Sequence, residues 1–317
     1  MRPHTPLPID AVTGDLTRRL QQETRAVLVA PPGAGKTTRV PLALLDEPWA
    51  LGKRLILLEP RRLAARAAAQ RMADTLEDAL GGVVGLRVRM QSRVSGRTRI
   101  EVVTEGVFAR MILDDPGLEG VGAVLFDEFH ERSLDADMGL ALALDAQAGL
   151  REDLRILVMS ATLDGARVSR LMGDCPVIES QGRAFPVETR HAPRDPRARL
   201  EEEVARLTAR ALAEEPGSLL VFLPGQGEIL RTADLLRERI KDPAVDIAPL
   251  FGAMDREAQD RAVQPAAKGR RKVVLATSIA ETSLTIEGVR VVIDSGLARV
   301  QRYEPDLGLS RLETVRV

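Results

Sequence analysis

The chain has very little cysteine and few aromatic residues. Cys175 is the single cysteine among 317 residues, so no disulfide can form within the chain. Nothing in this usage suggests an oxidising compartment, and we expect a cytoplasmic protein. Aromatic residues make up only 3% of the chain. This scarcity argues against a surface on which successive nucleic-acid bases stack.

The chain also lacks an excess of one charge and lacks a long apolar run. Lys and Arg number 45 against 46 Asp and Glu, which gives a formal net charge of −1. The chain therefore lacks the excess of positive charge that marks a simple nucleic-acid-binding protein. This balance does not exclude a local groove lined by basic residues. No apolar run approaches the roughly 20 residues of a membrane span. We expect no membrane partner, and nothing points to an obligate oligomer.

The strongest chemical signal is residues 28–38, which read Leu-Val-Ala-Pro-Pro-Gly-Ala-Gly-Lys-Thr-Thr. An apolar strand, a glycine-rich turn and a helix opening at Lys36 would cradle phosphate, because backbone N–H groups and the helix dipole point at the anion. Lys36 would reach the β- and γ-phosphates, and the Thr37 hydroxyl would hold Mg²⁺. The full pattern has glycine where this chain has Ala30, so an ordinary glycine-rich turn is the alternative. The predicted phosphate-binding residues are Gly33, Ala34, Gly35, Lys36, Thr37 and Thr38.

An acidic turn follows the apolar strand pattern at residues 121–126 and reads Asp127-Glu128-Phe129-His130. Carboxylates after a parallel strand lie at the sheet edge where α/β folds bind ligands. Asp127 would hold Mg²⁺ opposite Thr37, with Glu128 as a further metal-binding residue. Glu128 would also orient and deprotonate the attacking water. Such a turn is common by itself, but together with the phosphate loop it predicts hydrolysis of a metal-bound triphosphate.

A second polar stretch, Ser160-Ala161-Thr162, follows the next strand pattern along the chain. The hydroxyls of Ser160 and Thr162 would couple the acidic turn to a second domain. Thr162 could equally cap a helix, and both interpretations can hold together. No group of His and Cys has the spacing of a zinc site.

Short apolar patterns alternate with longer helical patterns in the first part of the chain, which predicts a parallel sheet with helices on both faces. The expected strands are Ala26–Ala30, Arg54–Leu58, Val83–Val88, Ile100–Thr104, Ala123–Phe126, Arg155–Ser160 and Pro176–Glu179. The expected helices include Leu63–Leu80, Gly106–Leu113 and Leu134–Ala148.

A charged stretch with several prolines at residues 181–197 indicates a linker, and a second α/β alternation follows it. The last residues, 297–317, alternate like a β-hairpin. We therefore predict two tandem α/β domains, at residues 1–180 and 181–317, with the phosphate loop in the first. A nucleotide would lie in the cleft between them. The expected elements of the second domain are helices Arg199–Glu214, Glu228–Ile240 and Arg256–Val263, and strands Leu219–Leu223, Val245–Leu250, Lys272–Ala276 and Val289–Ile293.

The ordered set of motifs resembles that of the superfamily-two helicases, and within them the DEAH-type RNA helicases. The phosphate loop and the acidic turn are similar to motifs I and II, although Phe129 stands where most of the group has Ala. Ser160–Thr162 is similar to motif III. Further matching stretches are Pro60–Ala65 (motif Ia), Thr104–Gly106 (motif Ib), Leu223–Gln226 (motif IV), Ala276–Ile286 (motif V) and the interdomain stretch Gly182–Val187.

This resemblance implies two RecA-like P-loop NTPase domains that use ATP and Mg²⁺. His130 would couple the γ-phosphate site to the second domain, while Thr285 and Glu287 would face the ribose and Arg71 would stack on the base. Binding to single-stranded RNA would be sequence-independent and salt-sensitive, because it goes to the backbone. The residues implied along that backbone are Arg61, Arg62, Thr104, Glu105, Gly106, Gly225, Thr277 and Ser278.

One motif of the family does not occur before Val317. It is the Gln-Arg-x-Gly-Arg-x-Gly-Arg run of motif VI, whose arginine fingers contribute about 10³–10⁵ in rate at related phosphoryl-transfer sites. The second domain is therefore expected to be incomplete at its C-terminus. Three functions stay open: an ATP-hydrolysing RNA helicase, a fragment that binds nucleotide and RNA without hydrolysis, and a helicase directed to DNA.

Overall fold

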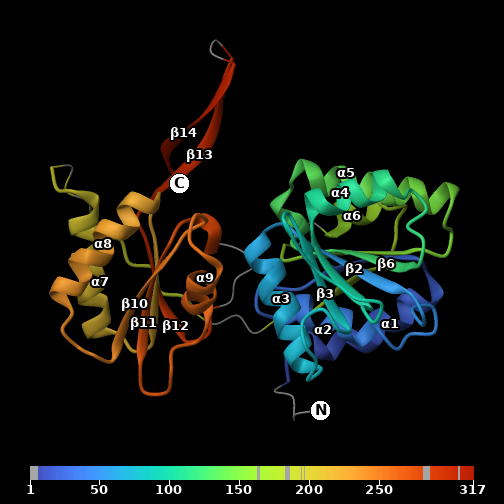
Figure 1. The fold of residues 1–317 in the computed structure, drawn as a ribbon, viewed down its shortest axis with the longest axis horizontal. Coiled ribbons are helices and arrows are strands. Elements are labelled where there is room, and N and C mark those ends of the chain that lie inside the picture. Colours follow the sequence, from blue (N-terminus) through green and yellow to red (C-terminus); the bar gives the residue numbers. More distant parts are fainter. Residues whose placement is uncertain are drawn as a thin grey trace. The chain divides into compact units, whose positions relative to one another are not determined.

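The structure is a computed structural model that describes residues 6–162, 165–182, 186–193, 195, 197–280, 286–305 and 308–317. The chain divides into two compact units, Met1–Pro186 and Val187–Val317 (Figure 1). Within the described residues, none of the helices has both the length and the apolar character needed to cross a membrane.

Eight of the described strands form the central sheet of the first unit. Neighbouring strands run parallel except for one antiparallel pair at the edge, so the predicted parallel α/β architecture is confirmed. The parallel strands end at one common sheet edge, where the loops that follow them meet. In spatial order the strands are β4 (Gln91–Arg93), β3 (Val84–Val88), β5 (Ile100–Thr104), β2 (Arg54–Glu59), β6 (Val121–Phe126), β7 (Arg155–Ser160), β1 (Arg25–Val29) and β8 (Val177–Glu179).

Helices cover both faces of this sheet (Figure 1). Alternate strand residues enter two separate cores: in β1, Leu28 lies in one core and Val27 in the other, both fully buried. Burying a side chain of this size stabilises the fold by about 1.5–3 kcal/mol. Because both faces are covered, the central strands read as continuous apolar runs. One face carries α1 (Asp10–Gln22), α2 (Lys36–Leu44) and α3 (Arg62–Thr75), and the other carries α4 (Glu105–Asp114), α5 (Leu134–Gly149) and α6 (Gly165–Leu171).

Some elements of this unit differ from the sequence-based expectation. The helix expected over Leu63–Leu80 ends at Thr75, and Glu77 just beyond it adopts the left-handed conformation with φ of 55°. A helix cannot continue through that conformation. The elements α1, α6 and β4 have no counterpart among the predicted ones. The last two are short, with seven and three residues, so their patterns span too few residues to show a period.

The second unit contains a smaller parallel sheet and an antiparallel hairpin. Its core takes alternate residues of the strands, such as Leu219 and Val273, which pack with Leu236 on one face of the sheet, and all three are fully buried. The sheet order is β10 (Val245–Leu250), β11 (Arg271–Ala276), β9 (Ser218–Phe222) and β12 (Val289–Asp294). The helices are α7 (Leu200–Glu214), α8 (Gln226–Arg239) and α9 (Arg256–Val263), and the expected hairpin is formed by β13 (Leu297–Glu304) and β14 (Leu309–Arg316).

Candidate functional site

The phosphate loop joins the end of β1 to the start of α2, and two glycines shape it. Gly33 and Gly35 have φ of 76° and 96°, a region that glycine enters without steric cost. A Cβ atom at Gly35 would lie 2.6 Å from Cδ1 of Leu7, so any side chain there would displace the N-terminal segment. A Cβ at Gly33 would meet nothing within 4 Å. The loop is therefore packed at Gly35 and open at Gly33.

Ala30 can replace the first glycine of the motif for a structural reason. Its side chain is fully buried, and its backbone does not have a positive φ. The Ala30 N–H donates to the carbonyl of Ser160 at 2.9 Å, which extends the pairing of β1 with β7. This position needs a small side chain but no glycine. The near match therefore still gives the strand–loop–helix conformation that binds phosphate.

The side chains of the loop meet the acidic turn after β6. Lys36 Nζ lies 2.8 Å from Glu128 Oε1 and 3.9 Å from Asp127 Oδ1. The Thr37 hydroxyl donates to Asp127 Oδ2 at 2.5 Å. The side chains of Lys36, Asp127 and Glu128 are only 4%, 0% and 9% exposed. The predicted phosphate-binding, metal-binding and water-activating groups are thus brought together in one buried cluster.

A third carboxyl group, which the sequence analysis does not single out, lies in the same cluster. Glu59 ends β2, is 1% exposed, and has an Oε2 atom without a hydrogen-bond partner. Burial, followed by the charges of Asp127 and Glu128, raises the pKa of Glu59 well above its ordinary value. Burial and then Asp127 also raise the pKa of Glu128. Three carboxyl groups share one ammonium group, so the cluster favours holding a proton.

The same negative charges favour the charged form of Lys36, whereas they disfavour the charged form of Glu59. Burial by itself would lower the pKa of Lys36, but the charges of Asp127 and Glu128 outweigh it and the pKa is raised. Lys36 therefore stays protonated throughout the physiological range. A cation held in this way between two carboxylates is positioned to exchange them for phosphate oxygens.

We expect Glu59→Gln to remove part of the pH dependence of stability. The ordinary pKa of a glutamate is 4.5; above it the unfolded chain loses a proton that the folded chain still holds. The free energy of unfolding therefore falls as the pH rises from 4.5 toward the raised pKa. Neutral glutamine removes this fall and should increase the unfolding free energy at pH 8 by about 1–3 kcal/mol, with little change near pH 4.5. Urea unfolding at both pH values measures it.

Glu101→Gln is the matched control, since Glu101 is a fully buried glutamate on the adjacent strand β5. It lies between Arg54 and Arg87, at 2.9 and 2.7 Å. Removing its charge leaves two guanidinium groups without their carboxylate, so this variant should lose stability at both pH values. A Glu59→Gln protein that is less stable than the parent at pH 8 would contradict the explanation that burial near Asp127 and Glu128 raises the pKa of Glu59.

His130 connects the acidic turn to the end of β7. Its Nδ1 accepts from the Ala161 N–H at 3.3 Å and lies 3.4 Å from Glu128 Oε2. Ser160 Oγ in turn lies 3.4 Å from Thr162 Oγ1. The coupling stretch predicted at Ser160 and Thr162 thus contacts the acidic turn through its middle residue, by a backbone group.

The oxygen atoms in this cluster suit Mg²⁺. The ion prefers oxygen ligands and is usually held by one or two carboxylates together with substrate phosphates. The Thr37 hydroxyl and the Asp127 carboxylate converge, with Glu128 beside them. Within the part of the chain that the structure describes, no group of three or more His, Cys, Asp and Glu side chains could hold a metal ion by itself. The residues therefore fit an ion that arrives with a nucleotide.

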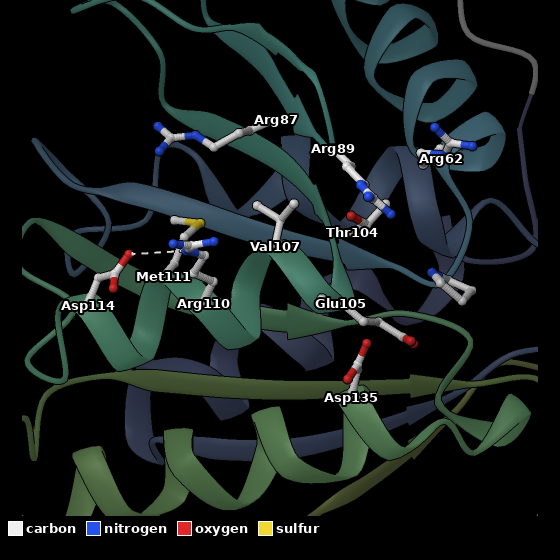
Figure 2. A pocket seen from close by; sticks show the side chains of 12 residues that line it. Arg62, Arg87, Arg89, Thr104, Glu105, Val107, Arg110, Met111, Asp114 and Asp135 are labelled. Atoms are coloured by element: carbon white, nitrogen blue, oxygen red, sulfur yellow. Dashed lines mark ion pairs between the residues drawn. The ribbon is translucent and has the colours of Figure 1, made fainter. Parts of the chain in front are cut away.

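A second feature of the first unit is a cavity of about 810 Å³. Figure 2 shows guanidinium groups of Arg62, Arg87 and Arg89 along one side and the carboxylates of Glu105 and Asp135 along another. Its wall joins the two stretches predicted to contact a nucleic-acid backbone. The lining residues are Pro60, Arg62, Arg87, Arg89, Thr104, Glu105, Gly106, Val107, Arg110, Met111, Asp114 and Asp135.

Two further predicted site residues of the first unit, Arg61 and Arg71, do not line this cavity. Arg61 Nη2 lies 3.3 Å from Glu131 Oε2. Arg71 is exposed on α3, the helix that follows β2. Its role as a base-stacking residue stays a prediction.

In the second unit, the predicted backbone-binding residues follow β9 and β11. Thr277 and Ser278 lie at the end of β11 and are not buried. Gly225 is buried, and a Cβ atom there would lie 2.1 Å from Nη1 of Arg299, whose guanidinium group covers it. Glu287 lies in the turn before β12. The predicted ribose-binding residue Thr285 lies outside the described residues.

Comparison with known proteins matches both units. The family described as DEAD/DEAH box helicase matches residues 14–171, and the one described as helicase conserved C-terminal domain matches residues 199–306. The chain is 53% identical over 311 residues to the ATP-dependent RNA helicase HrpB of Escherichia coli strain K12. The chain belongs to the DEAH-type superfamily-two helicases. The resemblance inferred from the ordered motifs is confirmed.

This DEAH-type helicase chain is also similar to a more distant relative and to a solved structure. It is 35% identical over 312 residues to the pre-mRNA-splicing factor ATP-dependent RNA helicase prp22 of Schizosaccharomyces pombe. The crystal structure of Escherichia coli DEAH/RHA helicase HrpB superposes with a TM-score of 0.91 at 53% identity. The chain covers 38% of the HrpB sequence, 27% of the prp22 sequence and 40% of the solved HrpB chain.

Three arginines that line the cavity of this DEAH-type helicase were not among the site residues predicted from the sequence. Arg87 and Arg89 are two positions apart where β3 ends, and Arg110 lies on α4 one turn after Gly106. Residues i and i+2 of an extended chain point to the same side, so the Arg87–Arg89 spacing was a usable signal. Glu59 offered no such signal, because only tertiary packing brings it to the acidic cluster.

Proposed function

We propose that the chain binds Mg-ATP at the phosphate loop of its first unit and couples ATP hydrolysis to movement along RNA or to its unwinding. The observation that supports this most directly is the buried cluster in which Lys36 contacts Glu128 and Thr37 contacts Asp127. The similarity to HrpB and prp22, which are named as ATP-dependent RNA helicases, supports the choice of nucleotide and nucleic acid.

In this proposal Lys36 changes partners when the nucleotide binds. Its ammonium group leaves Glu128 and donates to β- and γ-phosphate oxygens, which are the stronger anionic partners. Glu128 then loses its cation and becomes available to accept a proton from the attacking water. Burial raises the pKa of Glu128, and a base with a pKa nearer to neutrality transfers protons more effectively at physiological pH.

Thr37 and Asp127 are proposed to hold the ion that accompanies the nucleotide. When bound there, Mg²⁺ would neutralise the charge that develops on the phosphate oxygens. The Thr37 hydroxyl now donates to Asp127 at 2.5 Å. Holding an ion would turn both oxygens toward the same point. Release of the ion would restore this hydrogen bond.

The cavity of the first unit is proposed to contact the RNA backbone. Arg62, Thr104 and Gly106 line it together with Arg87, Arg89 and Arg110. Guanidinium groups bind phosphate oxygens by paired hydrogen bonds, and backbone contacts carry no base sequence information. Thr277 and Ser278 of the second unit, which are not buried, are proposed as further contacts, whereas the buried Gly225 is covered by Arg299. Binding should therefore depend on salt and little on sequence.

We expect Arg62→Ala to weaken RNA binding equally for unrelated sequences. The exposed Arg62 side chain lines the cavity, so its loss removes about one phosphate contact. The slope of log K against log salt concentration for a single strand should then fall in magnitude by about 0.7. Fluorescence anisotropy with two labelled single-stranded RNAs of different sequence, titrated at four salt concentrations, measures both effects.

Arg18→Ala serves as the control for this experiment. Arg18 lies on α1, is 64% exposed and pairs with Asp15 at 3.2 Å. It carries the same charge but does not line the cavity. Its loss should leave the affinity and the slope unchanged. If both variants change the slope equally, the arginine at position 62 acts through overall charge and not through a contact.

ATP turnover by the 317-residue chain, with and without single-stranded RNA, tests the proposed function as a whole. Lys36→Ala provides the blank. Turnover above the blank that rises with RNA, and less with DNA of the same sequence, is the expected result. Turnover equal to the blank contradicts the hydrolytic part. Equal stimulation by DNA contradicts the choice of RNA, since the 2′-hydroxyl is the group by which a protein tells the two apart.

A further inference from the structure

The seven residues 127–133 connect the phosphate site to the start of α5 by an unusual backbone path. A single 3₁₀ turn, Phe129–Glu131, lies between Glu128 and Arg132, which both adopt left-handed conformations with φ of 48° and 53°. Such conformations cost free energy for residues other than glycine and persist only where surrounding contacts hold them. We call residues 127–133 the connecting turn.

Side-chain contacts hold the connecting turn in this conformation. The Arg132 guanidinium group lies 5.7 Å from the centre of the Phe129 ring and 2.8 Å from Asp137 Oδ2. The Ser133 hydroxyl accepts from the Ala136 N–H at 2.9 Å and caps α5. The turn is therefore fixed at its far end to a helix. Asp127 and Glu128 at its near end contact Thr37 and Lys36.

Two contacts join the connecting turn to the proposed RNA-binding residues. Glu131 Oε2 lies 3.3 Å from Arg61 Nη2, and the two side chains are 17% and 28% exposed. The Ser133 hydroxyl donates to Glu105 Oε2 at 2.5 Å. Arg61 belongs to the stretch after β2, and Glu105 begins α4 after β5. One seven-residue segment thus touches the phosphate site and both backbone-binding stretches.

We propose that the connecting turn couples nucleotide binding to RNA binding within the first unit, with Glu131 and Ser133 as its positioning residues. Glu131 competes with an RNA phosphate for Arg61, and Ser133 fixes Glu105 at the cavity wall. When the phosphate site releases Glu128 from Lys36, the strained turn shifts and Glu131 competes less for Arg61. This inference rests on the proposed function.

The contact through His130 does not provide the same coupling. His130 connects the turn to the backbone of Ala161 at the end of β7. Neither Ala161 nor its neighbours line the cavity. The connections through Glu131 and Ser133 are the described ones that lead from the acidic turn to residues proposed to bind RNA.

Glu131→Gln tests the charge contact without changing side-chain size. In fluorescence anisotropy with labelled single-stranded RNA and no nucleotide, affinity should rise about two- to fivefold, because the partly buried ion pair no longer competes for Arg61. The salt slope should steepen by about 0.7, because one more cation meets phosphate. The change in RNA affinity caused by a non-hydrolysable ATP analogue with Mg²⁺ should shrink, because the two sites are less coupled.

Two further variants separate coupling from stability. Ser133→Ala should reduce the nucleotide-dependent change in RNA affinity, and Ser133→Thr, which keeps a hydroxyl group, should retain it. Asp153→Asn is the matched control for charge, since Asp153 pairs with Lys53 at 2.7 Å before β7, at the opposite sheet edge. It should change neither the salt slope nor the nucleotide effect.

The outcomes distinguish the two proposals. A parent chain that does not bind RNA overturns the proposed function itself. A parent chain whose RNA affinity changes with nucleotide, and a Glu131→Gln chain with the same change and the same salt slope, overturns the coupling role alone. An affinity that falls in Glu131→Gln together with its unfolding midpoint also overturns it, because that pattern indicates a structural ion pair.

Discussion

Glu128→Gln is expected to lower ATP turnover by about 10²–10⁴-fold, the range for losing a general base. Glutamine cannot accept the proton of the attacking water at neutral pH. Its amide oxygen can still accept a hydrogen bond from Lys36, which now lies 2.8 Å from Glu128 Oε1. The affinity for ATP should therefore stay close to that of the parent. Phosphate release at saturating ATP, with RNA present, measures the turnover.

The same substitution should leave the first unit at least as stable as before. The cluster contains the carboxyl groups of Glu59, Asp127 and Glu128 around one ammonium group, and burial raises the pKa of Glu128. Removing one of these buried carboxylates relieves repulsion between like charges. Urea unfolding at pH 8 should show an equal or higher midpoint for the variant.

Glu119→Gln is a suitable control for both measurements, because Glu119 is exposed in the loop before β6. It should change neither turnover nor stability. If Glu128→Gln keeps its turnover, Glu128 is not the base. If turnover and stability fall together, the loss reflects damage to the fold and does not identify a catalytic group.

Lys36→Ala is expected to have the largest effect on stability of any change at this site. Removing the cation leaves buried carboxylates without their partner, and breaking a buried pair in this way costs about 3–5 kcal/mol. ATP binding should be abolished as well, since the group proposed to donate to the β- and γ-phosphates is lost. Urea unfolding without nucleotide and binding of a fluorescent ATP analogue measure the two losses.

A second substitution separates the electrostatic cause from a packing defect. Adding Glu59→Gln to Lys36→Ala removes one of the uncompensated carboxyl groups and should restore part of the lost stability. It should not restore ATP binding. The double-mutant cycle gives the interaction between the two sites, which we expect to be favourable and above about 0.5 kcal/mol. Additive effects of the two substitutions would show that Lys36 stabilises the fold by packing alone.

The local features of the site can be predicted from the sequence. The phosphate loop at residues 28–38 carries its own conformation, because an apolar strand, glycines with positive φ and a helix start are specified by neighbouring residues. The acidic turn is similarly marked by a strand pattern ending in Asp127. The order of the motifs along the chain was enough to indicate the DEAH-type helicase family.

Tertiary structure alone decided which of these residues meet and what surrounds them. The strand order β2, β6, β7, β1 differs from the chain order, so β2 carries Glu59 to within the electrostatic reach of Asp127 across the sheet edge. The same order pairs Ala30 with Ser160, which explains why the first motif glycine is dispensable. The cavity at Arg62, Arg87 and Arg110 and the contacts of Glu131 and Ser133 depend on it too. Local sequence specifies backbone conformation, whereas burial and charge balance arise from residues that are distant in the chain.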